Sequence, residues 1–135
     1  EPRLPRDGTV SCASCHDPAL GLADGVPRGQ GIARERLPRH TPALWNLAWG
    51  AAFFWDGRAP TIEAQVRGPI EDRREMAETL PRIARKLSAE LAYRRAFATA
   101  FPGDRAIRPD AIAAALATYV RSLVSPRTRF DAWVE

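Results

Sequence analysis

The chain has 135 residues, with 20 Lys and Arg against 16 Asp and Glu, a formal net charge of +4 and 45% hydrophobic residues. This length and composition are typical of one globular domain, which we expect to span residues 1–135. The positive excess is small and scattered, so the charge predicts no nucleic-acid binding. No apolar run is long enough to predict a membrane span.

The first part of the chain is predicted to be mostly irregular. Residues 1–11 form a polar lead-in, and residues 17–40 are rich in glycine and proline without a sustained period. We expect this long loop to wrap around a bound group. Thr41 and Pro42 then predict the start of a short helix, which would end before Gly50.

Helices are expected to dominate the rest of the chain. One is predicted to begin at Thr61 and to end at Gly68-Pro69, followed by a charged loop over residues 70–78. No segment alternates as a strand does, so the predicted fold class is all-α. Three further helices are predicted by apolar residues at helical spacing: 80–87, one that follows Ser88 with Leu91, Phe97 and Phe101 on its apolar face, and 109–123 with Ile112, Leu116, Tyr119, Val120 and Leu123.

The sequence C-A-S-C-H at residues 12–16 is a C-x-x-C-H signature. The thiols of Cys12 and Cys15 can add to two vinyl groups of one porphyrin, and the imidazole of His16 can then ligate the iron. A zinc site needs further ligands and only His40 remains, while a redox C-x-x-C pair needs a strand before it. We therefore expect a cytochrome c-like helical domain wrapped around one covalent haem c, in an exported, periplasmic protein.

The sixth coordination position of the iron decides what such a haem does. A second strong protein ligand makes an electron carrier, whereas an open face lets the iron bind peroxide or another small ligand. Met76, the only methionine, and His40 are the candidate ligands. The spacing from His16 favours Met76, although Met76 can equally be core filler and His40 a loop residue.

Five stretches carry a more specific signal than the haem motif. They are DGTVSCASCHDP (7–18), RHTPALWN (39–46), FFWDGRAPTIEAQVRGPI (53–70), EM (75–76) and FDAW (130–133). Together they resemble the N-terminal, peroxidatic haem domain of the bacterial di-haem cytochrome c peroxidases and their MauG-like relatives. The resemblance covers nearly the whole chain, and FWDGRA followed by EAQ and GPI is its most specific part.

The resemblance implies a role for each matching residue. His16 resembles the proximal ligand, and Gln65 and Glu75 resemble the polar pair on the peroxide-binding side of the ring. The other matches are Phe54 and Pro69, which resemble residues that shape that pocket, and Trp55, which resembles the tryptophan that passes electrons between two haems.

Peroxide chemistry agrees with these roles. A carboxylate such as Glu75 can take a proton from bound peroxide and give it to the leaving oxygen, and Gln65 can orient peroxide by hydrogen bonding. Without the resemblance, Glu75 would be a solvated charge within the sequence EDRREMAE, Gln65 a helix-surface residue and Trp55 a core residue.

Three departures from the family pattern matter. Counted from His16, the histidine that closes the resting haem in many relatives is replaced by Ile32, so we expect an open pocket. His40 stands where many relatives have an asparagine that helps hold calcium, and because imidazole is a poor calcium ligand a calcium site is doubtful. The chain has no second C-x-x-C-H. It is either part of a larger protein or a single-haem version fed by a partner.

Three functions follow from these observations. The first is a peroxidase-type oxidoreductase that reduces hydrogen peroxide with electrons from a redox protein, a second haem domain or a second subunit. The second is an electron-transfer cytochrome with His16 and Met76, or His40, as axial ligands. The third is a haem-based ligand-binding module. We favour the first because of the resemblance.

Overall fold

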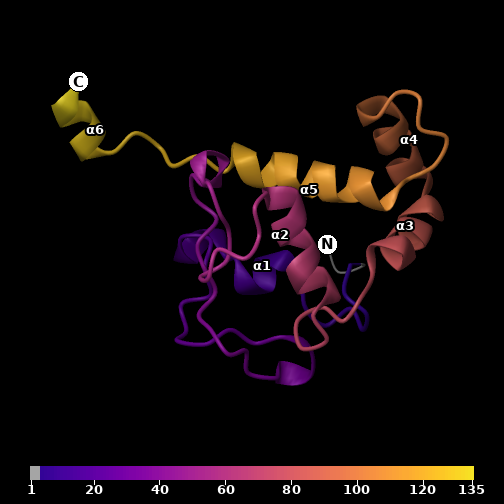
Figure 1. The fold of residues 1–135 in the computed structure, drawn as a ribbon, viewed down its shortest axis with the longest axis horizontal. Coiled ribbons are helices and arrows are strands. Elements are labelled where there is room, and N and C mark those ends of the chain that lie inside the picture. The colour runs from indigo at the N-terminus through magenta and orange to yellow at the C-terminus, as the bar shows by residue number, and fades with distance from the viewer. Residues whose placement is uncertain (1–3) are drawn as a thin grey trace.

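The computed structural model describes residues 4–135, and this part of the chain is helical without strands (Figure 1). The predicted all-α class is therefore confirmed. Within it, no helix is long and apolar enough to cross a membrane. The α-helices are α1 (Cys12–Cys15), α2 (Ile62–Glu71), α3 (Leu80–Ser88), α4 (Leu91–Ala100), α5 (Pro109–Ser122) and α6 (Arg129–Val134), and the 3-10 turns are η1 (Pro18–Leu20), η2 (Ile32–Arg34) and η3 (Leu47–Trp49).

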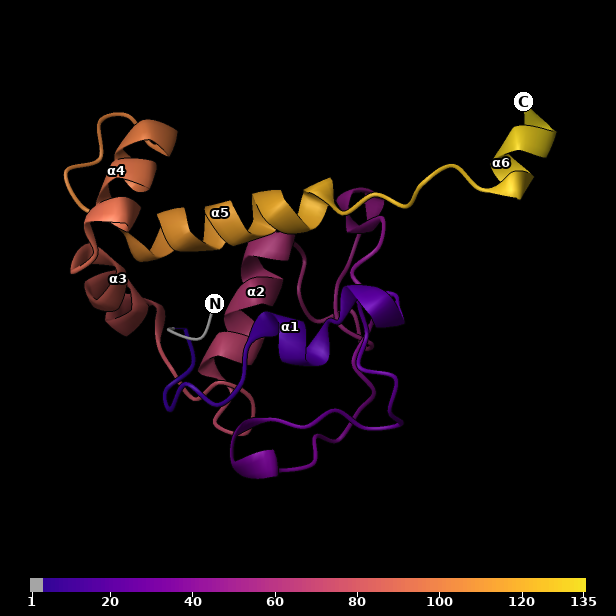
Figure 2. The ribbon, with the colours of Figure 1, turned by 180° about the vertical axis from the view of Figure 1, so that it is seen from behind.

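The core forms where α5 crosses the end of α2 and continues over α3 (Figures 1 and 2). Thr61 caps α2, its side chain accepting the Ala64 N–H at 3.1 Å. Side chains at four-residue spacing on α2 then face the core, as an amphipathic helix requires. The buried residues of the three helices are Ile62, Val66 and Ile70 on α2, Leu80, Ile83, Ala84 and Leu87 on α3, and Ala111, Ile112, Ala113, Ala117 and Val120 on α5.

The segment between α1 and α2 is irregular, as predicted for residues 17–40. Isolated β-bridges close its loops. The prediction that a helix begins at Thr41-Pro42 is wrong. Thr41 does not cap a helix, because its hydroxyl donates to the buried carboxylate of Asp24 at 2.6 Å, and Asn46 adopts a left-handed φ of 60°. Only the turn η3 forms, and Gly50 ends it as expected.

The predicted end of α2 at Gly68-Pro69 is also wrong, since the helix continues to Glu71. Burial of Ile70 in the core favours the extra turn. Gly68 is required for space rather than for termination, because a Cβ there would lie 2.5 Å from Cζ of Phe54. The glycine thus lets an aromatic ring lie directly on the helix backbone.

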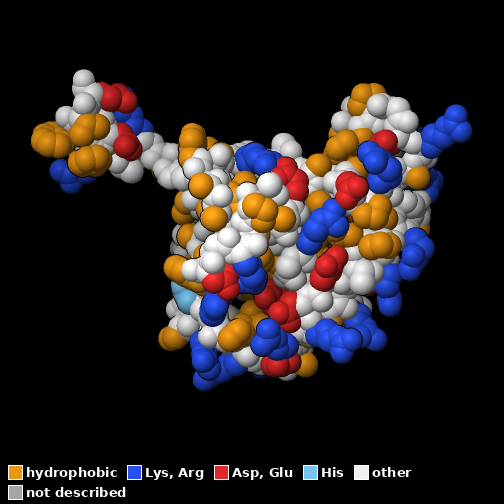
Figure 3. Space-filling view, viewed as in Figure 1, with side chains coloured by type: hydrophobic (Ala, Val, Ile, Leu, Met, Phe, Trp, Pro, Cys, Tyr) orange, Lys and Arg blue, Asp and Glu red, His pale blue; other side chains and the backbone are white. Residues whose placement is uncertain are grey.

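Two predicted core residues lie at the surface. Leu91 on α4 and Tyr119 on α5 are 51% and 63% exposed, so neither belongs to the buried face of its helix. Helix α6 was not predicted. It stands apart from the other helices in both ribbon views, and its apolar side chains gather at the far end of the space-filling view (Figure 3). Phe130 and Trp133 there are 66% and 79% exposed.

A clasp at Asn46 ties the chain beyond α5 to the irregular segment. The Asn46 N–H donates to the Leu123 carbonyl at 2.9 Å. Its side-chain amide donates to Oγ of Ser125 at 3.0 Å, and its Oδ1 accepts the Ser125 N–H at 3.0 Å. The backbone at residues 123–125 is therefore fixed to the loop that precedes η3.

Glu78 is a buried carboxylate at the start of α3. It is 2% exposed, and it accepts the Thr79 N–H and Arg82 Nε at 3.0 Å each and pairs with Lys86 Nζ at 2.6 Å. Lys86 also donates to the Pro5 carbonyl at 3.2 Å. Burial by itself would raise the pKa of Glu78, but the bonds from Lys86 and Thr79 outweigh it and hold that pKa below its ordinary value.

Replacing Glu78 by glutamine should therefore destabilise the fold. We expect Glu78→Gln to lower the free energy of unfolding by about 1.5–3 kcal/mol, measured by urea denaturation, because the hydrogen bonds lost are to charged groups. The exposed glutamate Glu71, changed to glutamine, is the control and should stay within about 0.5 kcal/mol. Since the folded pKa of Glu78 is depressed, its contribution is present at neutral pH and is lost as the pH falls through the folded pKa. Equal unfolding midpoints at neutral pH would contradict this role.

Candidate functional site

The cysteines of the C-x-x-C-H motif lie on one turn of helix. Ser14 Oγ accepts the Ser11 N–H at 2.9 Å and closes the N-terminus of α1. Residues three apart on a helix are neighbours on one face, so Cys12 and Cys15 lie on the same side. Both thiols are free of disulfides. The helix ends at Cys15, and the N–H of the next residue, His16, donates to the Cys12 carbonyl at 2.8 Å.

His16 is held by backbone carbonyl groups of Leu22 and Pro42. Its Nδ1 lies 2.9 Å from the Leu22 carbonyl oxygen, which can only accept, so Nδ1 carries the proton in this contact. Burial lowers the pKa of His16 and outweighs the opposing Leu22 contact. A neutral imidazole with Nδ1–H bonded to a carbonyl is the form that ligates metals through Nε2.

One cavity of about 550 Å³ joins this motif to the residues of the predicted peroxide-binding side. Cavities of roughly 300–1,000 Å³ hold small molecules and cofactors. The free thiols, the half-buried imidazole of His16 and the large adjoining cavity together fit a covalently attached haem. The candidate site residues that line the cavity are Cys15, His16, His40, Phe54, Trp55, Gln65, Pro69 and Glu75.

Glu75 lies in the turn that follows α2 and is half-buried. Burial first, and the charge of Asp72 second, raise the pKa of its carboxyl, while Arg74 and Arg58 act in the opposite direction. A raised pKa brings the carboxyl closer to the range in which it can both accept and return a proton.

The α2 residues of the site lie on the face that adjoins its core stripe, because Gln65 and Pro69 each precede a buried residue by one position, roughly 100° around the helix. Gln65 and Pro69 are four residues apart and half-buried against the cavity. The Phe54 ring lies between Gly68 and the guanidinium of Arg58, whose central carbon is 3.5 Å from the ring centroid. Phe54 has a left-handed φ of 66°, which a non-glycine residue adopts only when its surroundings hold it.

An arginine clamp at the cavity was missed by sequence reasoning. Arg39 and Arg58 each donate to the Asp56 carboxylate at 2.8 Å, joining two loops of the cavity wall. The bond from Arg58, followed by that from Arg39, lowers the pKa of Asp56 to about 2. The D-G-R triplet at residues 56–58 was a signal that could have found the pair within one loop, whereas Arg39 required the fold.

The remaining candidate residues, Trp55, His40 and Met76, differ in whether they lie at the cavity or in the core. Trp55 is not a core residue, since it is 61% exposed at the cavity, where its indole N–H donates to the His40 carbonyl at 2.8 Å. His40 itself is exposed, and its Nδ1 lies 2.7 Å from the Val26 carbonyl oxygen. Met76 is 6% exposed within the hydrophobic core cluster and does not line the cavity.

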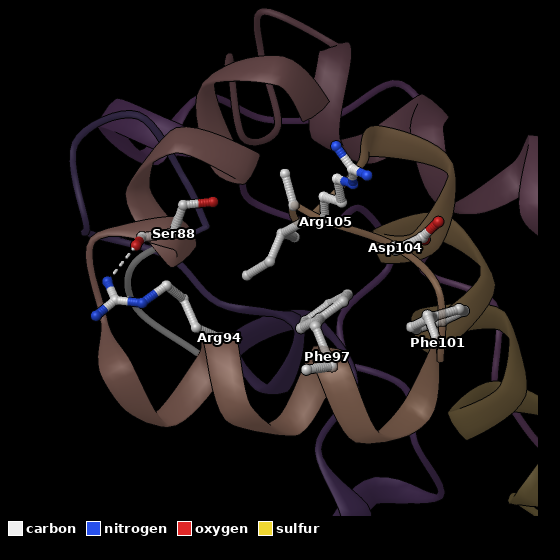
Figure 4. A pocket seen from close by; sticks show the side chains of 9 residues that line it. Ser88, Arg94, Phe97, Phe101, Asp104 and Arg105 are labelled. Atoms are coloured by element: carbon white, nitrogen blue, oxygen red, sulfur yellow. Dashed lines mark hydrogen bonds between the residues drawn. The ribbon is translucent and has the colours of Figure 1, made fainter.

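A second, smaller cavity of about 300 Å³ lies beside α4 (Figure 4). Phe97 and Phe101 stack at 5.6 Å along one wall, and Arg94 donates to the Ser88 carbonyl at 2.7 Å on another. None of the candidate site residues lines it. Within residues 4–135, no group of three or more His, Cys, Asp and Glu side chains is gathered where it could hold a metal ion.

The model of the family described as di-haem cytochrome c peroxidase matches residues 1–135. The chain belongs to this family. It is 47% identical over 133 residues to the methylamine utilization protein MauG of Methylorubrum extorquens, covering 98% of this chain and 38% of that protein. It is 36% identical to the cytochrome c551 peroxidase of Pseudomonas aeruginosa, covering 100% of this chain and 39% of that protein.

Solved structures agree with the family assignment. A MauG-like protein associated with microbial copper homeostasis superposes with a TM-score of 0.91 at 29% identity, covering 99% of this chain and 40% of its own. The predicted cytochrome c-like fold and the resemblance are thereby confirmed, and the chain is a peroxidase-like c-type haem domain. It spans about two fifths of the length of the curated relatives it matches. The family binds haem and acts on peroxide with redox partners.

The position of Met76 leads to a spectroscopic test. Because its side chain packs in the core, we expect Met76→Leu to leave the optical and EPR spectra of the ferric, haem-loaded protein unchanged and high-spin at neutral pH. A Met-to-Leu exchange costs less than about 1.5 kcal/mol, so the variant should fold. His40→Ala is the companion variant, with the same expected result. A low-spin parent spectrum that turns high-spin in either variant would identify that residue as the sixth ligand.

Proposed function

We propose that residues 1–135 form one domain that carries a single haem c, attached through Cys12 and Cys15 with His16 as axial ligand, and that this domain reduces hydrogen peroxide to water. The observation that supports the proposal most strongly is the shared cavity, because Cys15, His16 and Glu75 all line it. The family assignment supports the same reaction.

The haem, when bound, supplies an iron that binds peroxide and delivers the electrons that split its O–O bond. Glu75 accepts a proton from the oxygen that binds and returns it to the oxygen that leaves. The amide of Gln65 donates a hydrogen bond that orients the peroxide. Two electrons from a partner and two protons from solvent, relayed through Glu75, complete the conversion of one peroxide to two waters.

The remaining site residues shape the cavity and its access. Phe54 and Pro69 narrow the space beside Glu75, which favours a small ligand over a large one. The indole of Trp55 lies at the cavity and is also exposed, so it can serve as the point of electron entry. The partner is then a redox protein, a second haem domain or a second subunit that approaches Trp55.

The setting of the reaction follows from its cofactor. We propose that the protein is exported to the periplasm, because haem attachment to C-x-x-C-H occurs outside the cytoplasm. Any calcium site beside His40 would be weak, since imidazole is a poor calcium ligand.

Removing the carboxylate tests the assignment of Glu75. We expect Glu75→Gln to lower the second-order rate constant for hydrogen peroxide with the ferric, haem-loaded protein by about 10²–10⁴-fold, the usual contribution of a general acid–base. Stopped-flow absorbance measures it. Glu71→Gln, an exposed glutamate change four positions earlier, should leave the rate constant unaltered. A Glu75→Gln protein as fast as the parent would remove Glu75 from the mechanism.

The raised pKa of Glu75 predicts the pH dependence of the same rate constant. Glu75 must be deprotonated to accept the peroxide proton, so the rate should fall as the pH drops through that raised pKa. Because the Asp72 charge contributes to the shift, Asp72→Asn should move the acid limb to lower pH. An acid limb that persists in Glu75→Gln would assign the titration to another group.

A further inference from the structure

Residues 29–37 form a small closed hairpin beside the site. The Leu37 N–H donates to the Gly29 carbonyl at 2.8 Å, and the Gly31 N–H donates to the Glu35 carbonyl at 3.0 Å. At the tip, Ala33 and Arg34 both have left-handed φ values of 52° and 58°. The conformation of the hairpin is therefore fixed by hydrogen bonds within its own backbone.

The hairpin contacts the haem-attachment cysteine and the backbone of Glu75. The Cys15 sulfur lies 3.6 Å from the Gln30 carbonyl oxygen. Two residues further on, the Ile32 N–H donates to the Glu75 carbonyl at 3.1 Å. Residues 30–32 thus span from the haem-attachment cysteine to the backbone of the carboxylate residue.

Gly31, between these two contacts, is buried against the backbone of residues 74 and 75. A Cβ on Gly31 would overlap the Arg74 carbonyl oxygen, and it would lie 2.7 Å from the carbonyl carbon of Arg74 and 3.0 Å from Cα of Glu75. Its φ of −96° is negative, so the position does not need glycine for a left-handed backbone. Glycine is needed here because a side chain has no space.

The opposite side of the Glu75 turn is fixed by α2. The Glu75 N–H donates to the Asp72 carbonyl at 3.1 Å, and the Met76 N–H donates to the Pro69 carbonyl at 3.1 Å. The turn is held between the end of α2 and the hairpin, so a side chain at position 31 can be accommodated only by moving the 74–75 peptide or the hairpin itself.

We propose that Gly31 is a positioning residue for Glu75: its missing side chain sets how closely the turn carrying Glu75 approaches the cysteine that anchors the haem. This inference rests on the proposed function. Gly31 touches no substrate and acts only through the backbone of residues 74 and 75. The Ile32 N–H contributes to the same positioning through its hydrogen bond to the Glu75 carbonyl.

A double-mutant cycle on the haem-loaded protein tests the proposal. We expect Gly31→Ala to lower the second-order rate constant for hydrogen peroxide by about tenfold or more, since misplacing a catalytic group by about 1 Å can cost 10²-fold. In the Glu75→Gln background the same change should cost less than about twofold, because residues that act through one another are non-additive. Arg36→Ala, a change of an exposed side chain on the same hairpin, is the control and should retain the parent rate.

Two further readouts separate positioning from general damage. Hydrogen exchange should show that Gly31→Ala loses protection at the Ile32 amide while α2 and α5 keep theirs. The acid limb of the pH–rate profile should also shift, because the surroundings of the Glu75 carboxyl change. If Gly31→Ala does not fold, Ile32→Pro removes the N–H donor to the Glu75 carbonyl at the first position of η2 and should show the same non-additivity. Ile32→Ala, which keeps the N–H and loses only the side chain, is its control and should retain most of the parent rate.

The outcomes distinguish the two proposals. A parent-like Glu75→Gln protein overturns the role of Glu75 and the positioning of it together. An impaired Glu75→Gln protein combined with a parent-like Gly31→Ala protein, or with equal losses from Gly31→Ala in both backgrounds, overturns only the positioning.

Discussion

The site depends on helix α2, which packs one face in the hydrophobic core and lines the cavity with another. One face buries Ile62, Val66 and Ile70 in the core shared with α5. Each buried aliphatic side chain stabilises the fold by about 1.5–3 kcal/mol. The other face lines the cavity with Gln65 and Pro69. Because a rigid helix joins the two faces, the position of the Gln65 amide depends on the hydrophobic packing of the adjoining face.

The segment between α1 and α2 has a different physical basis. It contains few buried apolar side chains, and its backbone groups are satisfied by short bridges and turns rather than by helices. Polar contacts such as Thr41 to Asp24, and the Asp56 clamp between two arginines, join its loops around the cavity. A bound haem would complete the core that this part of the chain does not build for itself.

Sequence reasoning succeeded where one physical cause dominated. The apolar stripes of α3 and α5 located those helices within a residue or two, and the C-x-x-C-H pentapeptide indicated the haem by its chemistry. It failed where a residue could serve two purposes. Thr41 can cap a helix or donate to a carboxylate, and Gly68 can end a helix or admit an aromatic ring. The fold decides between these roles, because it brings Asp24 next to Thr41 and Phe54 next to Gly68.

The clasp at Asn46 has a mechanical consequence. The chain leaving α5 towards α6 is fastened to the loop before η3, and the adjoining residues Pro42, Ala43 and Leu44 form part of the cavity wall. The segment that leaves α5 is thus attached to this loop at a single residue, Asn46. Because three hydrogen bonds join that segment to Asn46, we expect a change in its position to be passed to the cavity wall through this one residue.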